Sequence, residues 1–304
     1  FGLNSVAIAN KTSVFRIKKM TEHSSDHLVS TAWLADHLDA PDVVVLDASW
    51  HLPTAGRDPK AEYLEDHIPG ALFFDIDDLS DETSDLPHML PSAVKFSSRM
   101  RRMGIGDGKR IVVYDTTGLF SAARAWWMFR IFGHDDVAIL DGGFKKWLAE
   151  DRATEDGPPS PRQERHFSAR QQSMMVRDKD DVLSAINTSS AQIADARSAP
   201  RFSGQEKEPR AGLRSGHMPG AFNVHYASLL KEDGTLKSAA DIQSAFIDAG
   251  VDLERPVITS CGSGVTAAIL SLGLNLLGHD DHTLYDGSWS EWGGIPELPV
   301  DSDG

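Results

Sequence analysis

Short runs of apolar residues alternate with longer segments of mixed polarity along most of the chain. These runs lie at residues 43–46, 110–114 and 137–140, and again at 192–194, 256–259 and 282–285. Continuous apolar runs of this length are typical of strands buried on both faces. Segments between them, such as 121–132 and 266–277, have the length and pattern of helices. This alternation predicts an α/β fold with parallel sheets and helices on both faces.

An internal repeat divides the chain into two halves. The motif at 67–71 (His-Ile-Pro-Gly-Ala) recurs at 217–221, the motif at 46–49 recurs at 194–197, and the motif at 140–143 recurs at 285–288. The order is the same in both halves, which indicates a duplicated domain and not a solenoid of short repeats. His67 and His217 head the same turn motif in both halves, so we interpret them as structural.

The repeat predicts two tandem domains, at 26–151 and 178–304, joined by a linker at 152–177. The linker contains Asp-Gly-Pro-Pro-Ser-Pro at 156–161, which can continue neither a helix nor a central strand. Residues 1–25 are expected to lie outside the fold, as a disordered N-terminus or a segment added in expression. We predict a cytoplasmic protein; a mitochondrial location is the alternative if the basic residues 1–19 are a targeting segment.

The charge of the chain excludes some functions. The sequence has 30 basic and 45 acidic residues, for a net charge of −15. Such a chain repels a phosphate backbone, so nucleic acid is excluded as a partner. No apolar run reaches the roughly 18 residues of a membrane helix, so a membrane span is excluded too. An anion site would have to be built locally from a few basic side chains.

Cys261 is the single cysteine, so an intramolecular disulfide and a Cys-rich metal site are excluded. It directly follows an apolar strand, where active sites of open α/β sheets lie. Gly262 and Gly264 follow it and would let the backbone adopt positive φ and turn its N–H groups inward. Such a nest in front of a helix stabilises a thiolate. We therefore interpret Cys261 as a nucleophile; an inert buried cysteine is the alternative.

The cysteine loop, Cys261-Gly-Ser-Gly-Val-Thr266, resembles that of the 3-mercaptopyruvate sulfurtransferases, in the two-domain rhodanese superfamily. The resemblance covers nearly all of residues 30–298. Its motifs include Asp-Ala-Ser-Trp at 47–50, Phe-Asp-Ile-Asp at 74–77, His-Met-Leu-Pro at 88–91, Trp-Trp-Met-Phe at 126–129, Asp-Gly-Gly at 141–143 and Tyr-Asp-Gly-Ser-Trp at 285–289. It implies two tandem rhodanese-like domains, of which the second carries the nucleophile. In the first half, Asp115 falls near the place of the cysteine.

The resemblance implies a sulfurtransferase that takes sulfur from 3-mercaptopyruvate as a Cys261 persulfide and releases pyruvate, without a metal or organic cofactor. Thioredoxin, glutathione, another small thiol or cyanide would then accept the sulfur. Arg201 and Arg210 match the substrate-binding arginines of the family, and Gly262, Gly264, Val265 and Thr266 complete the substrate loop. Ser263, His88 and Asp77 match a catalytic Ser–His–Asp set. Trp289 is a candidate to shape the mouth of the site, whereas Trp292 matches Trp147 of the first half and is expected to pack within its domain.

Three other functions compete with this one. A thiosulfate sulfurtransferase is the nearest, but its cysteine loop is cationic by family resemblance, whereas this loop carries no charge. A rhodanese-like phosphatase would need a longer loop that ends in an arginine, and Thr266 and Ala267 stand there instead. A non-catalytic binding protein with a rhodanese fold would have no need of Cys261 together with Arg201 and Arg210.

Overall fold

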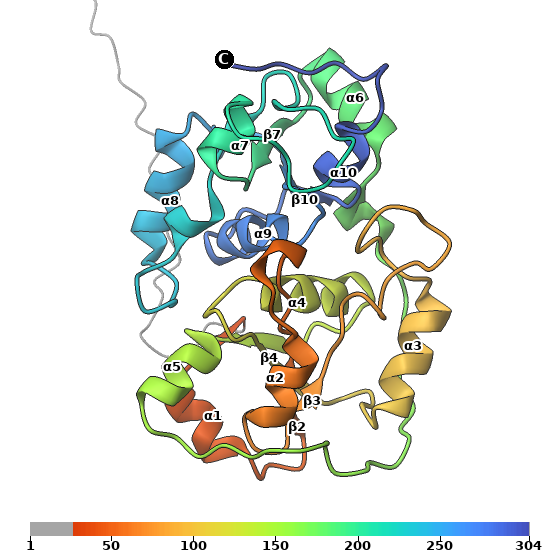
Figure 1. Cartoon of the computed structure of the whole chain (residues 1–304), viewed down its shortest axis with the longest axis vertical. Helices are drawn as coiled ribbons and strands as arrows, with labels where there is room; N and C mark the ends of the chain where they lie inside the picture. Colours follow the sequence, from red (N-terminus) through yellow and green to blue (C-terminus); the bar gives the residue numbers. More distant parts are fainter. Residues whose placement is uncertain (1–26, 304) are drawn as a thin grey trace, which may run out of the picture.

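The computed structural model describes residues 27–303, which form two α/β domains stacked on each other (Figure 1). Each domain contains one five-stranded sheet, and every strand pair within the two sheets is parallel. The predicted fold class and the predicted pair of tandem domains are confirmed.

The two sheets have the same topology. The first has the strand order β1 (Leu28–Val29), β5 (Val137–Leu140), β4 (Arg110–Tyr114), β2 (Val43–Asp47), β3 (Leu72–Phe73). The second has the order β6 (Val176–Arg177), β10 (His282–Tyr285), β9 (Val257–Ser260), β7 (Gln192–Asp195), β8 (Phe222–Asn223). The shared order is what a duplicated domain requires. All six strands expected from the apolar runs are present, and the four two-residue strands were not predicted.

Helices cover both faces of each sheet. In the first domain, α3 (Ala93–Arg102) and α4 (Ala122–Ile131) pack on one face, and α1 (Thr31–His37), α2 (Pro59–Glu65) and α5 (Gly143–Ala149) on the other. In the second domain, α8 (Ala239–Asp248) and α9 (Ala267–Leu276) pack on one face, and α6 (Lys179–Thr188) and α10 (Ser288–Trp292) on the other. The short helix α7 (Ala199–Ser203) follows β7, and 3₁₀ turns lie at Pro53–Ala55, Ser173–Met175 and Tyr226–Leu229.

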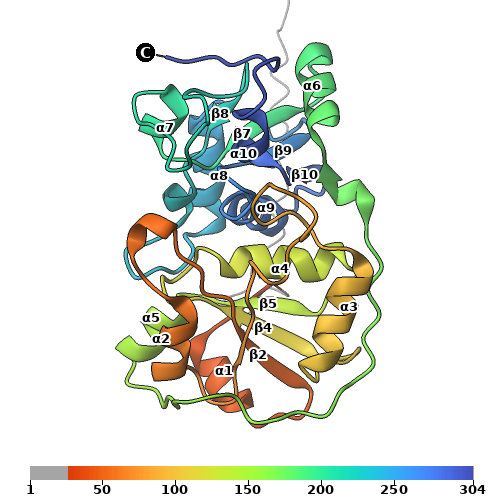
Figure 2. The same ribbon diagram turned by 45° about the vertical axis from the view of Figure 1, so that its right-hand side comes forward.

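Helices α4 and α9 form the contact between the domains, as both views show (Figures 1 and 2). Nearly every residue of α4 and the first eight residues of α9 are buried. A helix that is apolar on all sides must be covered on all sides. Because each packs on its own sheet and on the other helix, one continuous apolar core includes residues of both domains. The carboxyl ends of β4 and β9, with the loops that lead into these helices, therefore lie near the domain boundary.

The segment between the domains passes along the outside of the first domain (Figure 2). Glu155 pairs with His67 through two backbone hydrogen bonds, and Phe167 is buried in the first domain's core. Among residues 27–303, no helix is both long and apolar enough to cross a membrane. The predictions made for residues 1–25 lie outside the described residues.

Candidate active site

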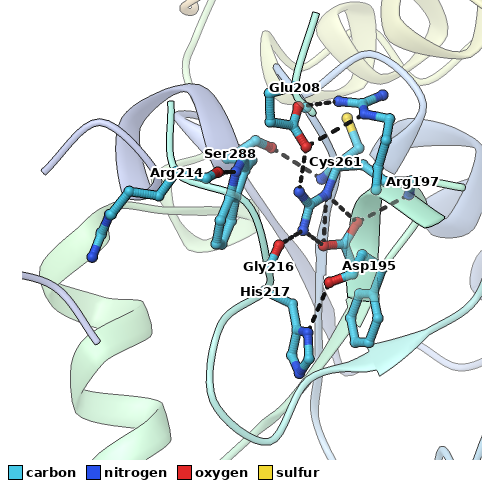
Figure 3. Close-up of polar contacts among 12 residues, drawn as sticks. Asp195, Arg197, Glu208, Arg214, Gly216, His217, Cys261 and Ser288 are labelled. Carbon is cyan, nitrogen blue, oxygen red and sulfur yellow. Dashed lines mark hydrogen bonds and ion pairs between the residues drawn. The ribbon is translucent and has the colours of Figure 1, made fainter. Parts of the chain in front are cut away.

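Cys261 follows the last residue of β9 and is 2 % exposed. Its backbone N–H donates to Ser288 Oγ at 3.2 Å, and its carbonyl accepts from the N–H of Trp289 at 2.9 Å. Figure 3 shows Cys261 together with Ser288 and the nearby charged residues Arg197 and Glu208. The cysteine is thus fixed between the end of a central strand and the start of α10.

The two glycines of the cysteine loop serve different purposes. Gly264 has φ +75°, and a Cβ there would lie 2.9 Å from Arg124 Nη1 and 3.0 Å from the carbonyl oxygen of Asp286. Gly262 does not have positive φ, so the prediction that both glycines adopt it was wrong for this residue. A Cβ at Gly262 would lie 3.1 Å from Arg201 Nη2, so the missing side chain makes room for a guanidinium.

The first domain shows what such a loop can bind. Asp115 follows β4 as Cys261 follows β9, as the repeat predicted. Its carboxylate accepts backbone N–H groups from Thr117 at 3.0 Å, Phe120 at 2.7 Å and Ala122 at 2.9 Å. The loop and the start of α4 thus enclose an anion supplied by the chain itself. In the second domain, the equivalent position carries a thiol that can ionise.

An ion-pair chain lies beside Cys261. Glu208 accepts from Arg201 Nη2 at 2.5 Å and from Arg197 Nη1 at 2.7 Å. Arg197 is also paired with Asp195 at 2.6 Å (Figure 3). Its guanidinium lies 4.3 Å from the centre of the Trp289 ring. The side chains of Arg197, Asp195 and Glu208 are at most 2 % exposed, whereas that of Arg201 is 17 % exposed. Burial therefore holds Arg201 in place while part of its guanidinium stays accessible.

Arg210 approaches the cysteine loop from the same segment. Its Nη2 donates to Ser263 Oγ at 3.3 Å, and no carboxylate within residues 27–303 lies within ion-pair distance of its guanidinium. The pKa of Arg210 is lowered, mainly by burial, and the nearby Cys261 offsets only part of this shift. The three arginines, Arg197, Arg201 and Arg210, carry one charge more than the two carboxylates that pair with them, Asp195 and Glu208. One positive charge beside the thiol is therefore not compensated by an ion pair.

Ser263, His88 and Asp77 form a hydrogen-bonded chain across the domain boundary. His88 Nδ1 lies 3.0 Å from Ser263 Oγ, and His88 Nε2 lies 3.0 Å from Asp77 Oδ1. Because an ionised carboxylate only accepts, Nε2 carries the proton in the neutral ring, and Nδ1 accepts from the serine hydroxyl. The hydrogen bond from His88 lowers the pKa of Asp77. Trp50 Nε1 donates to the second carboxylate oxygen of Asp77 at 3.0 Å, which fixes its orientation.

A buried ion pair holds the histidine loop against the cysteine loop. Arg124 of α4 pairs with Asp286 at 2.7 Å, and both side chains are at most 5 % exposed. Arg124 also donates to the carbonyl oxygen of His88 and, at 3.4 Å, to that of Gly264. His88 itself has φ +62°, a conformation that is costly for a residue with a side chain. The pair therefore stabilises a strained backbone at the residue that contacts Ser263.

These side chains surround a pocket of about 270 Å³ at the carboxyl ends of the strands. Its wall includes seven of the ten predicted site residues: Cys261, Gly262, Ser263, Val265, Thr266, Arg201 and Arg210. His88 and Asp77 approach through Ser263, and Gly264 packs against Arg124. Trp50, Leu52 and Phe120 of the first domain close the other side.

Some expectations fail or are incomplete. Trp289 is fully buried and does not shape the mouth, because its ring packs inside the second domain. Trp292 is buried in the same cluster, as expected from its match to Trp147. His67 and His217 are buried, and each Nδ1 bonds a backbone carbonyl, as expected of structural histidines. Sequence reasoning missed Arg197, Glu208 and Arg124. Only Arg197 had a signal, since the repeat places it where the first domain has Ser49.

Comparison with known proteins finds relatives over most of the chain. A family model described as the rhodanese-like domain matches residues 30–150 and 178–294. The 3-mercaptopyruvate sulfurtransferase of Escherichia coli K12 is 46 % identical over 279 residues, which covers 91 % of this chain and 99 % of that protein. The thiosulfate sulfurtransferase of Rattus norvegicus is 42 % identical over 272 residues, which covers 87 % of this chain and 91 % of that protein. The crystal structure of SseA from Escherichia coli, a 3-mercaptopyruvate sulfotransferase, aligns with TM-score 0.80 and 44 % identity over 86 % of this chain and 98 % of that one.

Proposed function

The chain belongs to the rhodanese family, and from this premise we propose that it is a 3-mercaptopyruvate sulfurtransferase. It takes sulfur from 3-mercaptopyruvate onto Cys261, releases pyruvate and passes the sulfur to a thiol or to cyanide. Relatives named for this reaction are 43–46 % identical over most of the chain.

The observation that carries the choice of donor is the charge of the pocket. Arg201 is neutralised by Glu208, and Arg197 by Asp195, so Arg210 supplies the single uncompensated positive charge. One positive charge complements the single carboxylate of 3-mercaptopyruvate better than a dianion such as thiosulfate. The two accessible guanidinium groups, of Arg201 and Arg210, also supply donors for a carboxylate and a neighbouring keto oxygen.

The first half-reaction forms one bond and breaks one. The Cys261 thiolate attacks the sulfur of the donor, so that a new S–S bond forms and the bond between that sulfur and C3 breaks. The electron pair of the broken bond moves into the enolate of pyruvate. A proton on C3 then completes pyruvate, and Cys261 is left as a persulfide.

We assign Ser263, His88 and Asp77 to the protons and charge of this step. When the donor is bound, the Ser263 hydroxyl turns from His88 Nδ1 to the keto oxygen, where enolate charge develops, while its oxygen still accepts from Arg210 Nη2. His88 exchanges a proton through Ser263, and Asp77 holds the ring in the required tautomer. Both residues come from the first domain, so the site needs both domains even though the first has no nucleophile.

The second half-reaction needs an acceptor from outside. Cys261 is the single cysteine of the sequence, so no second thiol in the chain can take the sulfur. A small thiol, thioredoxin or cyanide attacks the outer sulfur and regenerates the Cys261 thiolate. A cytoplasmic location belongs to the proposal and rests on the sequence alone.

Thiosulfate is the alternative donor, favoured by the similarity to the rat thiosulfate sulfurtransferase. The test is kcat/KM on both donors, for the wild type and for Glu208→Gln. We expect the wild type to prefer 3-mercaptopyruvate. Removing the Glu208 charge adds one positive charge to the pocket, so the preference should shift toward thiosulfate, by about tenfold.

The matched control is Glu206→Gln. Glu206 lines the same pocket, but it is exposed and no basic group within residues 27–303 lies within ion-pair distance of it, so water screens its charge. Its removal should change the ratio of the two kcat/KM values far less than Glu208→Gln does. A wild type that prefers thiosulfate would overturn the choice of donor.

A further inference from the structure

A second cavity, of about 550 Å³, adjoins the catalytic pocket. The side chains of Leu52, Phe120 and Tyr226 line both. The two cavities therefore share part of their walls, and a ligand in the second cavity lies beside the pocket of Cys261. The reaction proposed above does not otherwise use this cavity.

Both domains build the second cavity, and their contact there is tight. Its first wall is the loop after β4, and its second is the hairpin at 230–236, closed by the bridge between Leu230 and Leu236. A Cβ at Gly118 would lie 2.8 Å from Gly234 Cα, so the backbones meet directly. The N–H of Leu236 donates to Asp141 Oδ1 across the boundary at 2.9 Å. The cavity is thus a fixed part of the fold.

The charge of this cavity opposes that of the whole chain. Lys145 and Lys231 line it, and no carboxylate of residues 27–303 lies within ion-pair distance of either ammonium group. Lys145 Nζ instead donates to the carbonyl oxygen of Glu232 at 3.0 Å. Arg57, at the edge, is already paired with Glu62 at 2.7 Å. Glu232 also lines the cavity, so the side chains there that lack an ion-pair partner are two lysines and one carboxylate. Even in a chain of net charge −15, this excess of positive charge favours an anion.

The sizes of the two cavities suit different ligands. At about 270 Å³, the catalytic pocket is smaller than the roughly 300–1,000 Å³ typical of drug-sized ligands and suits a small keto acid. The second cavity, at about 550 Å³, has room for a ligand of short-peptide size. An acceptor that delivers a thiol to Cys261 must keep the rest of its body outside the catalytic pocket.

We propose that the second cavity binds the sulfur acceptor, a peptide-sized thiol whose carboxylates contact Lys145 and Lys231. This proposal rests on the proposed function. The acceptor thiolate attacks the outer sulfur of the Cys261 persulfide, a new S–S bond forms, and the bond to Cys261 Sγ breaks with its electron pair on that sulfur. The acceptor leaves as a persulfide and its thiol proton passes to Cys261, so no oxidant or reductant is needed.

The test compares glutathione with glutathione diethyl ester, which has the same thiol but neither free carboxylate. In the double variant Lys145→Glu/Lys231→Glu, we expect the KM for glutathione to rise about tenfold or more, with kcat little changed. The KM for the ester should not rise. Lys109→Glu is the control, because Lys109 also bonds a backbone carbonyl, that of Pro41, but lines neither cavity.

A separate readout distinguishes this proposal from the proposed function. The burst of pyruvate from 3-mercaptopyruvate without any acceptor reports the first half-reaction alone and should be the same in wild type and double variant. No burst in the wild type would contradict the proposed function. A normal burst with an unchanged KM for glutathione, or with an equal rise for the ester, would overturn the acceptor site.

Discussion

At the scale of single residues, the arginines around Cys261 differ in how their charge is balanced. Arg197 is buried between two carboxylates, Arg201 shares one of them, and Arg210 has a serine hydroxyl as its partner. The sequence suggested Arg201 and Arg210 by resemblance alone, and nothing in it indicated that Glu208 would neutralise one of them. Such a pairing depends on how a loop folds back, which residue spacing does not specify.

The contact between His88 and Ser263 could not be predicted from patterns in the sequence either. The two residues are 175 positions apart and belong to different domains. Each half has its own periodicity, but no pattern within a half describes how the two halves pack. The structure brings these residues together, and their catalytic roles are part of our proposal.

Asp77 provides a prediction that separates the orientation of the His88 ring from the stability of the fold. Its side chain is 63 % exposed, so water screens its pairing with His88 and the free energy of unfolding should change little in Asp77→Asn. Loss of the charge weakens control of the His88 tautomer, so kcat should fall about 10- to 100-fold with little change in KM. Steady-state kinetics and urea unfolding of both proteins check this.

The pH dependence of the kcat difference between wild type and Asp77→Asn follows from the direction in which the pKa of Asp77 is shifted. The pKa of Asp77 is lowered in the folded protein, so its carboxylate is fully ionised above the ordinary value of about 3.9. It loses its charge, and its interaction with His88, only as pH falls through the lowered pKa. The loss of kcat in Asp77→Asn should therefore be present at every pH above about 5, where the wild-type carboxylate is ionised. Equal kcat values of the two proteins at about pH 7 would contradict the assigned role.

At the scale of elements, long apolar strands were predictable and two-residue strands were not. The runs at β4, β5 and β10 match the observed strands at both ends. The strands β1, β3, β6 and β8 have two residues each, too few to show any period. They lie at the edges of the sheets, where pairing with a neighbouring strand defines them.

The ends of β2 and β7 illustrate how two copies of one motif diverge. Asp195 is paired with Arg197, whereas Asp47 in the first domain faces Ser49, Tyr114 and Asp115. Burial is the main cause that raises the pKa of Asp47 to about 6. The folded state therefore retains a proton that the unfolded chain loses near pH 4, and stability falls as pH rises through this interval.

This difference predicts that Asp47→Asn is stabilising at high pH. The variant should be about 3 kcal/mol more stable than the wild type at about pH 8, and about equal to it near pH 4. Urea unfolding at both pH values measures the change. Asp195→Asn is the matched comparison and should destabilise at about pH 8, because it leaves Arg197 with one partner fewer. A wild type more stable than Asp47→Asn at pH 8 would refute the cause assigned to the pKa.

At the scale of the whole molecule, the two domains share one apolar core through α4 and α9. The internal repeat predicted two domains, but not that both sheets would present a face to this common core. The extent of that contact explains why a domain without a nucleophile contributes side chains to the pocket. We expect both domains to unfold in a single transition.

The buried pair of Arg124 and Asp286 tests this coupling. Replacing Arg124 with Met leaves a buried carboxylate without its partner and should lower the free energy of unfolding by about 3–5 kcal/mol. Activity should fall too, because Arg124 holds the backbone of His88. Denaturant unfolding and kinetics in native buffer measure both effects.

The control for this variant is Arg130→Met on the same helix. Arg124 lies 4.5 Å from the centre of the Trp127 ring, and Arg130 lies 5.2 Å from that of Trp126. Unlike Arg124, Arg130 has no carboxylate of residues 27–303 at ion-pair distance. Arg130→Met should therefore lower the free energy of unfolding much less than Arg124→Met does. Equal losses in the two variants would mean that the ion pair does not couple the domains.

The central claim is that Cys261 takes sulfur from 3-mercaptopyruvate, and the mass of the intact protein tests it most directly. After incubation with 3-mercaptopyruvate and no acceptor, we predict a gain of one sulfur atom located on Cys261, with one pyruvate released for each protein molecule. Cys261→Ser should gain no sulfur and release no pyruvate. Pyruvate released by the wild type without added sulfur, or by Cys261→Ser at the wild-type rate, would contradict the account.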